Sequence, residues 1–157
     1  MIYTDRLMIE LLSNEDMETI VLNEKDEDLI KAYSEMLLGS RTHPEQREWY
    51  AIWDIRLKDN INKISVGNMS FKGITDDGMI EIGYGIIPEY EGFGYATEAV
   101  LAIIKWAATQ KEVKRIEAET EADNYASQRV LEKSGFMQTG TTGQEGPRFF
   151  WPLSQFD

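Results

Sequence analysis

Residues 79–110 constrain the fold more than any other stretch, because they read in succession as a strand, a glycine-rich turn and an apolar helix. The strand alternates apolar side chains with Glu81, Gly83 and Gly85, a pattern that is typical of a strand with one buried face. Glycines inside a strand mark a bulge or a place where another group approaches the backbone closely. We therefore expect the face that bears Glu81 to be open to a substrate.

The turn that follows the strand contains Gly92 and Gly94. A turn that opens a helix directs unpaired N–H groups and the positive end of the helix dipole at one point, which is typical of an anion site built from backbone. Two common phosphate motifs do not fit. The Gly-Lys-Ser/Thr ending of a Walker loop is missing, and Thr97 stands where the dinucleotide fingerprint has its third glycine. An ordinary strand–helix connection would also use these glycines.

Composition narrows the class of protein. A chain of 157 residues that is 42% hydrophobic is long enough for one domain with a real core, which we place at residues 1–157. The lack of cysteine excludes a thiol nucleophile, a thiolate metal site and a disulfide framework. We also expect a cytoplasmic protein with no membrane partner, because the sequence has no long apolar run and no secretion signal.

The net charge of −12 limits the classes of partner that we expect the protein to bind. It argues against a nucleic-acid partner, because phosphate contacts need clustered Lys and Arg side chains. An acidic surface would attract a cationic amine, although acidity also serves simply to keep a protein soluble.

Periodicity and turn signals predict an α/β (α+β) fold with a single mixed, mostly antiparallel sheet and flanking helices. Strands are expected in residues 6–12, 51–57, 64–72, 79–87, 115–121 and 149–151. Helices are expected in residues 14–22, 27–38, 44–50, 97–110 and 124–134. Short turns make the strands from 51 to 87 an antiparallel meander, and a helical crossover makes the strand at 115 parallel to the strand at 79.

The same stretch resembles the core of the GNAT N-acetyltransferases, whose acyl-CoA-binding turn has the form Gln/Arg-x-x-Gly-x-Gly/Ala. Residues 91–96, Glu-Gly-Phe-Gly-Tyr-Ala, match this turn except that Glu91 replaces Gln or Arg. The resemblance extends to the segments at residues 4–9, 81–84, 96–100 and 124–136. The first and last of these look most like the Rim-type branch, which includes ribosomal-protein N-terminal acetyltransferases.

The resemblance implies a GNAT-like acyl-CoA acyltransferase fold and transfer of an acetyl group from acetyl-CoA, as co-substrate, to a primary amine without a metal. In that family the pantetheine arm pairs with the strand backbone, here near Ile86 and Ile87. Asn124 is expected both to cap a helix and to contact CoA. The N–H groups expected to bind the pyrophosphate are those of Gly92, Phe93, Gly94, Tyr95 and Ala96, with Thr97 as a further contact.

Two side chains are candidates for proton transfer within the resemblance. Glu81 corresponds to the glutamate that takes a proton from the amine, often through water; its alternative role is to pair with a nearby arginine. The tyrosine that protonates the leaving thiolate in many relatives is replaced here by Leu131, so Ser127, one helical turn earlier, is the candidate acid. A helix serine bonded to its own backbone is the alternative.

The departures at Glu91 and Leu131 leave a second functional hypothesis open, namely a catalytically silent acyl-CoA-binding sensor or interaction module. The acceptor of an active enzyme would be a protein N-terminus, a small-molecule amine or a polyamine, selected by residues 13–60. The protein would be a monomer or a homodimer.

Overall fold

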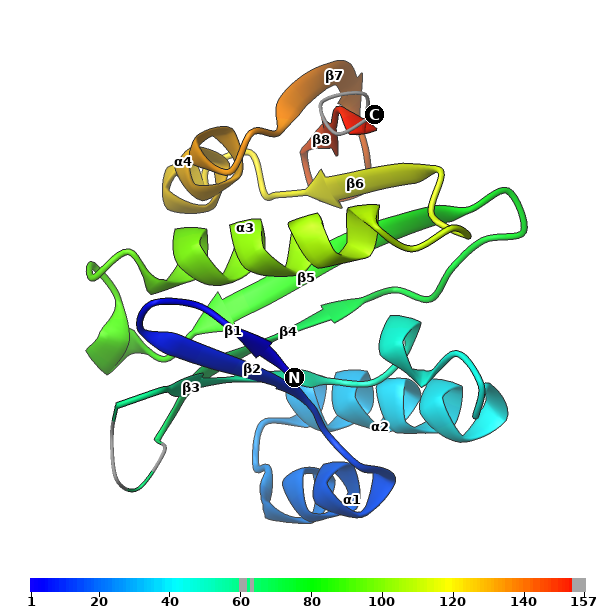
Figure 1. The fold of residues 1–157 in the computed structure, drawn as a ribbon, viewed down its shortest axis with the longest axis vertical. Coiled ribbons are helices and arrows are strands. Elements are labelled where there is room, and N and C mark those ends of the chain that lie inside the picture. Colours follow the sequence, from blue (N-terminus) through cyan, green and yellow to red (C-terminus); the bar gives the residue numbers. More distant parts are fainter. Residues whose placement is uncertain (60–61, 63, 154–157) are drawn as a thin grey trace.

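A computed structural model describes residues 1–59, 62 and 64–153. Its framework is one eight-stranded sheet in the order β1-β2-β3-β4-β5-β6-β8-β7 (Figure 1). The strands are β1 (Ile2–Tyr3), β2 (Leu7–Leu11), β3 (Trp53–Leu57), β4 (Ser65–Phe71), β5 (Met79–Ile86), β6 (Arg115–Glu119), β7 (Met137–Thr142) and β8 (Pro147–Trp151). The helices are α1 (Asn14–Asn23), α2 (Glu27–Thr42), α3 (Tyr95–Ala108) and α4 (Tyr125–Lys133), with short 3-10 helices at Arg47–Trp49 and Pro88–Tyr90.

The strand pairing confirms the predicted fold class. Strands β3, β4 and β5 form the expected antiparallel meander, and β5 pairs with β6 in parallel. Every other neighbouring pair in the described sheet is antiparallel. The described sheet is therefore mixed and mostly antiparallel, with its one parallel pair between β5 and β6.

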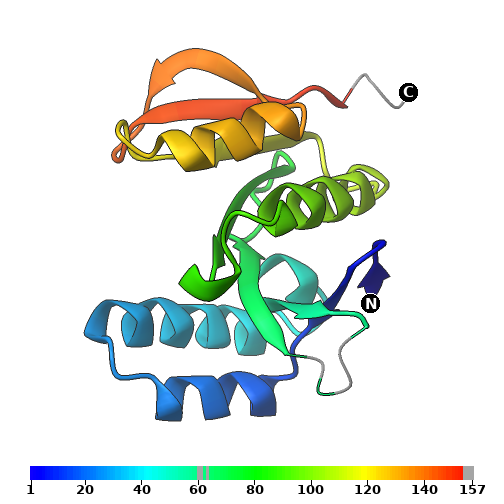
Figure 2. The ribbon, with the colours of Figure 1, turned by 90° about the vertical axis from the view of Figure 1, so that its left-hand side faces the viewer.

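Helix α3 packs its apolar side chains on the sheet and fixes the position of the glycine turn that precedes it. Val100, Ile103 and Ile104 are fully buried, together with Ile80 of β5 and Leu7 of β2. Burying one such side chain stabilises the fold by about 1.5–3 kcal/mol. In Figure 2, α1 and α2 lie on the other side of the sheet from α3, where they form a second, smaller apolar cluster.

Helix α4 begins and ends where the sequence predicts. The Asn124 Oδ1 atom accepts a hydrogen bond from the Ser127 N–H, 3.1 Å away, which satisfies one free donor of the first turn. Gly135 ends the helix with a φ of 97°, a left-handed conformation that favours glycine. The Phe136 N–H then donates to the Leu131 carbonyl at 2.9 Å and closes the last turn.

The segment after residue 38 differs from the prediction. Helix α2 continues to Thr42, and residues 44–50 contain only a 3-10 helix instead of the expected α-helix. A partly buried polar cluster from distant segments contacts the last turn of α2. Ser40 is fully buried and donates to Asn14 Oδ1 at 2.6 Å, and Arg47 Nε donates to Ser40 Oγ at 2.8 Å. These bonds hold the last turn of α2 in place.

Strands β5 and β6 separate at the end that carries the glycine turn. Their paired register runs from Met79↔Arg115 to Ile82↔Ala118 and stops there, although β5 continues to Ile86 (Figures 1 and 2). Helix α3 begins beside the separated end of β5, and α4 follows the end of β6. The two helices and the two strand ends together frame the candidate site.

Candidate active site

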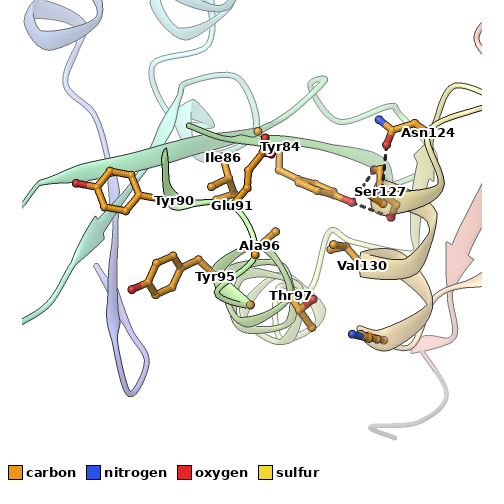
Figure 3. Close-up of a pocket in the computed structure, with 15 residues that line it drawn as sticks. Tyr84, Ile86, Tyr90, Glu91, Tyr95, Ala96, Thr97, Asn124, Ser127 and Val130 are labelled. Atoms are coloured by element: carbon orange, nitrogen blue, oxygen red, sulfur yellow. Dashed lines mark hydrogen bonds between the residues drawn. The ribbon is translucent and has the colours of Figure 1, made fainter. Parts of the chain in front are cut away.

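A cavity of about 480 Å³ lies between the separated end of β5, the glycine turn and α4 (Figure 3). The structure brings most of the predicted site residues to it. Those that line the cavity are Ile86, Gly92, Gly94, Tyr95, Ala96, Thr97, Asn124 and Ser127. Glu81 and Ile87 are not among the lining residues, and Phe93 contributes an exposed ring that stacks near Tyr95 rather than lining the cavity.

The open edge of β5 directs backbone groups of Tyr84 and Ile86 toward this cavity. On the side of β5 that faces β4, the Glu81 carbonyl accepts a hydrogen bond from the Lys72 N–H, and the Ile87 N–H donates one to the Val66 carbonyl. Because successive residues of a strand direct their N–H and C=O groups to opposite sides, Tyr84 and Ile86 point away from β4. No residue of β6 pairs with them in the described register.

The prediction for Ile87 needs correction. Its N–H donates to the Val66 carbonyl at 2.8 Å, and its carbonyl accepts from the Tyr90 N–H at 2.8 Å. Its N–H is therefore used within the protein and cannot donate to an extended ligand, and its carbonyl already accepts one hydrogen bond. The strand groups available for such pairing belong to Tyr84 and Ile86.

The glycine turn presents a row of unpaired N–H groups. In the part of the chain that the structure describes, none of the N–H groups of residues 92–97 donates to a protein acceptor, and the first N–H that does is that of Glu98. Gly92 and Gly94 have φ values of 85° and 82°. Only glycine adopts this conformation readily, so these two residues make the turn that aligns the amides at the start of α3.

Arg6 is a residue near the turn that the sequence analysis did not single out. Its Nε donates to Glu98 Oε1 at 2.8 Å, its guanidinium lies 4.6 Å from the centre of the Tyr95 ring, and its Nη2 lies 3.5 Å from where a Cβ of residue 94 would be. Burial raises the pKa of Glu98, but hydrogen bonds from Thr4 and Arg6 outweigh it and lower that pKa overall. The signal was Thr-x-Arg in residues 4–9, which the resemblance contained without assigning a role.

Glu91, the departure from the family turn, lines the cavity. No cation pairs with its exposed carboxylate among residues 1–59, 62 and 64–153. Arg6 lies near the same turn but is paired with Glu98, and Lys133 is a cation that lines the cavity. An anion bound in the cavity would therefore face the amides of the turn as well as the Glu91 carboxylate.

Tyr84 and Ser127 form a hydroxyl pair among the residues that line the cavity (Figure 3). The Tyr84 Oη atom is 2.8 Å from Ser127 Oγ and donates to the Ser127 carbonyl at 3.1 Å. The Ser127 hydroxyl thus contacts a phenol from β5 instead of a carbonyl of its own helix. Burial raises the pKa of Tyr84 above its ordinary value of 10.0, so the phenol stays protonated at neutral pH.

Glu81 lies in an ion-pair cluster and not on the cavity wall. Its carboxylate is 2.7 Å from Lys72 Nζ and 2.8 Å from Arg148 Nη2. Burial raises the pKa of Glu81, but the hydrogen bonds from Lys72 and Arg148 outweigh it, so the pKa is lower than the ordinary 4.5. This arrangement is the alternative that the sequence left open, a glutamate paired with an arginine, and a role as base remains a prediction.

Arg148 ties Glu81 to two further carboxylates of β6. Its Nη2 also contacts Glu117 Oε1 at 2.8 Å, and its Nη1 contacts Glu119 Oε1 at 2.6 Å. Glu81 and Glu117 are directly opposite in the β5–β6 register, where two like charges would repel each other. Arg148 removes that repulsion next to the point where the two strands separate.

No group of three or more His, Cys, Asp or Glu side chains among the described residues gathers in a geometry that could hold a metal ion. None of the described helices is both long and apolar enough to cross a membrane.

Comparison with known sequences identifies related proteins. Residues 4–137 match the family model described as Acetyltransferase (GNAT) domain. The uncharacterized N-acetyltransferase YoaA of Bacillus subtilis is 29% identical over 154 residues, which cover 90% of this chain and 85% of YoaA. The uncharacterized N-acetyltransferase YjdG of the same species is 43% identical over 86 residues, 54% of this chain; that match spans 50% of YjdG.

Solved structures with the same fold include two from Vibrio cholerae. A spermidine N-acetyltransferase in complex with CoA and spermine has a TM-score of 0.73 and 15% identity, with 96% of this chain and 98% of that chain covered. A putative ribosomal-protein-serine acetyltransferase has a TM-score of 0.68 and 18% identity, with 95% and 94% covered. At these identities the likeness concerns the fold.

The match of most of the chain to one family model and the shared fold agree with the cavity between β5 and α4. The chain therefore belongs to the GNAT family of acetyl-CoA-dependent N-acetyltransferases, as its sequence motifs predicted.

Proposed function

We propose that this protein transfers the acetyl group of acetyl-CoA to a primary amine by direct attack of the amine on the thioester. The observation that carries the proposal is the row of unpaired N–H groups at residues 92–97 beside the open edge of β5. The amides suit the pyrophosphate of CoA. Tyr84 and Ile86 suit the pantetheine arm, which would pair with them as an added strand.

Besides orienting the two reactants, the side chains of this protein can transfer protons. The amine nitrogen bonds to the thioester carbon and the carbon–sulfur bond breaks. The nitrogen loses a proton to water, and the sulfur gains a proton from a donor in the site. Positioning supplies most of the rate, because a thioester needs little activation. We assign the proton donor to the Tyr84–Ser127 pair, since its hydroxyls are 2.8 Å apart and line the cavity.

Tyr84→Phe tests this assignment. The substitution keeps the ring and removes the phenol that contacts Ser127, so we expect kcat to fall about 100-fold, the lower end of the range for acid–base catalysis. The dissociation constant of CoA should stay within about twofold, because the N–H groups of the turn are unchanged. Tyr125→Phe is the matched control, because Tyr125 is 72% exposed and does not line the cavity. An unchanged kcat in Tyr84→Phe would remove the pair from the mechanism.

Glu81→Gln separates the two roles open to Glu81. Both carboxylate oxygens are engaged by cations and the pKa is lowered, so we expect the pH profile of kcat to keep its shape and kcat to change less than about threefold. The melting temperature should fall by a few degrees, because Gln weakens two charged hydrogen bonds. A large loss of kcat with a shifted pH profile would instead establish Glu81 as the base.

Two measurements test the proposed function as a whole. Calorimetry with CoA should show binding, and thiol release from acetyl-CoA should respond to at least one amine in a panel of peptide N-termini, monoamines and polyamines. Absence of CoA binding would contradict the proposal. Tight CoA binding without transfer to any amine would instead favour the acyl-CoA-binding sensor or interaction module.

Two observations bear on which amine is the acceptor. The spermidine N-acetyltransferase of Vibrio cholerae, which has the same fold, was solved in complex with CoA and spermine. The net charge of −12 of this protein would attract a cationic amine. We keep a polyamine, a small amine and a protein N-terminus in the panel for this reason. The Rim-type branch, the cytoplasmic location and a monomeric or homodimeric state remain predictions.

A further inference from the structure

Packing around its two glycines does not hold the glycine turn in place. A Cβ added at Gly92 would meet no atom of a described residue within 4 Å beyond its chain neighbours, and one added at Gly94 would meet only Arg6 Nη2, at 3.5 Å. The first turn of a helix frays readily. The alignment of the N–H groups of residues 92–97 therefore needs support from another part of the chain.

The connection between β1 and β2 supplies such support through the Glu98 carboxylate. Glu98 Oε2 accepts hydrogen bonds from the Thr4 hydroxyl and from the Arg6 N–H, the latter at 3.0 Å. Glu98 Oε1 accepts one from Arg6 Nε at 2.8 Å. Three donors from one short connection thus converge on a single carboxylate, and hydrogen bonds to a charged acceptor are the strong ones.

Glu98 is the residue that closes the first turn of α3. Its N–H donates to the Gly94 carbonyl at 3.1 Å, directly after the row of unpaired N–H groups. A second contact reaches the same turn, because the Arg6 guanidinium lies 4.6 Å from the centre of the Tyr95 ring and Tyr95 lines the cavity. The β1–β2 connection therefore holds α3 at the position where the amides are presented.

The β1–β2 connection is itself fixed to the sheet. The Thr4 N–H donates to the Leu7 carbonyl and the Leu7 N–H donates to Thr4 Oγ1, both at 2.9 Å, and Leu7 is fully buried. Next to β3, the Lys58 N–H donates to the Arg6 carbonyl at 2.8 Å and Lys58 Nζ donates to the Thr4 carbonyl at 3.1 Å. The donors that hold Glu98 are thus in fixed positions.

We propose that Thr4, Arg6 and Glu98 are positioning residues of the CoA site, which hold the first turn of α3 so that the N–H groups of residues 92–97 stay directed at one place. This inference rests on the proposed function, in which those N–H groups bind the pyrophosphate. None of the three residues lines the cavity, so they act through the turn and not on the ligand. Amides that are already aligned bind an anion more tightly, because binding does not have to order them.

Glu98→Gln separates positioning from simple electrostatics. Glutamine keeps the shape but removes the charge and replaces one acceptor oxygen with a donor, so we expect the dissociation constant of CoA to rise about tenfold. Electrostatics alone predicts tighter binding, because a negative charge near an anion site is lost. Glu91→Gln, the same change at a residue that lines the cavity, should lower the dissociation constant. A dissociation constant for Glu98→Gln at or below the wild-type value would overturn the proposal.

Arg6→Met tests the other partner and the link between the two. We expect the dissociation constant of CoA to rise about tenfold, and to rise no further in Arg6→Met/Glu98→Gln, because each substitution breaks the same link. Arg115→Met is the matched control. Arg115 is 50% exposed, Arg6 is 45% exposed, and Arg115 pairs with Glu117 outside the cavity, so its loss should leave CoA affinity unchanged. Additive effects of the two substitutions, about 100-fold together, would contradict a shared role.

Kinetics distinguish positioning of the turn from a contribution to folding alone. At a temperature well below unfolding, we expect KM for acetyl-CoA to rise in both single variants and kcat to stay within about threefold, because the Tyr84–Ser127 pair is unchanged. A lower melting temperature with unchanged KM and CoA affinity would reduce the three residues to a structural role. That result would contradict this inference alone, whereas failure of CoA to bind the wild type would contradict the proposed function as well.

Discussion

Gly94→Val is expected to raise the dissociation constant of CoA about 100-fold, which corresponds to about 2.7 kcal/mol of binding free energy. Residue 94 has a φ of 82°, a conformation that costs a β-branched side chain about 1–3 kcal/mol. Valine therefore favours a different backbone at the start of α3. The amides of residues 92–97 then cease to point at one place, and several charge-assisted hydrogen bonds to the pyrophosphate weaken together.

The matched control for this variant is Gly140→Val. Gly140 has a φ of 86°, and a Cβ added there would meet no other atom within 4 Å, so the backbone cost is similar and no clash is added. It lies in β7, outside the cavity. Both variants should lose comparable thermal stability, and only Gly94→Val should lose CoA affinity by calorimetry. Equal CoA affinity in the two variants would show that the turn at residues 92–97 does not bind the diphosphate.

The parts of the fold that the sequence predicts correctly depend on short-range signals. Turn residues between adjacent strands fix the β3–β5 meander, and Asn124 and Gly135 mark the ends of α4 because their effect is local. Strand β7 escapes prediction because Met137–Thr142 is polar and largely exposed, so no alternation of apolar residues marks it. Its pairing with β8 decides its structure.

The candidate site likewise has one part that the sequence predicts and another that it does not. The sequence predicts the glycine turn because two glycines, which have positive φ values in the structure, and the start of a helix lie within a few positions of each other. The pair Tyr84–Ser127 joins residues 43 apart in sequence, Arg6–Glu98 joins residues 92 apart, and Arg148–Glu81 joins residues 67 apart. Such contacts follow from strand order and helix packing, which one sequence does not specify. The sequence therefore left both roles of Glu81 open, and the contact with Arg148 came only with the structure, while the role as base remains a prediction.

Arg148→Met is expected to lower the free energy of unfolding by about 3 kcal/mol, the loss that follows when one partner of a buried charge cluster is removed. Arg148 is 20% exposed and contacts Glu81, Glu117 and Glu119, whose side chains are 14%, 13% and 8% exposed. Without it, the facing carboxylates of β5 and β6 repel each other in a partly dehydrated site. For a domain of this size the melting temperature should fall by about 10 °C.

Arg115→Met is the matched control for that variant, because Arg115 is 50% exposed and pairs with Glu117 alone among the described carboxylates. An exposed pair of this kind contributes less than about 1 kcal/mol, so thermal unfolding should separate the two variants clearly. Equal losses in both would show that the Arg148 cluster does not hold β5 and β6 together.

The pH dependence of the same variant gives an independent check. Burial raises the pKa values of Glu81 and Glu117, but their hydrogen bonds to cations outweigh it, so both folded pKa values lie below the ordinary 4.5. A carboxyl with a lowered folded pKa contributes stability that is present above its unfolded pKa and is lost as the pH falls through its folded pKa. The wild type should therefore lose stability below about pH 4.5 more steeply than Arg148→Met, in which these pKa values move back toward their ordinary range. Denaturant unfolding at a series of pH values should show the difference between the two proteins shrink as the pH falls, and a constant difference would contradict the assignment of these carboxylates to Arg148.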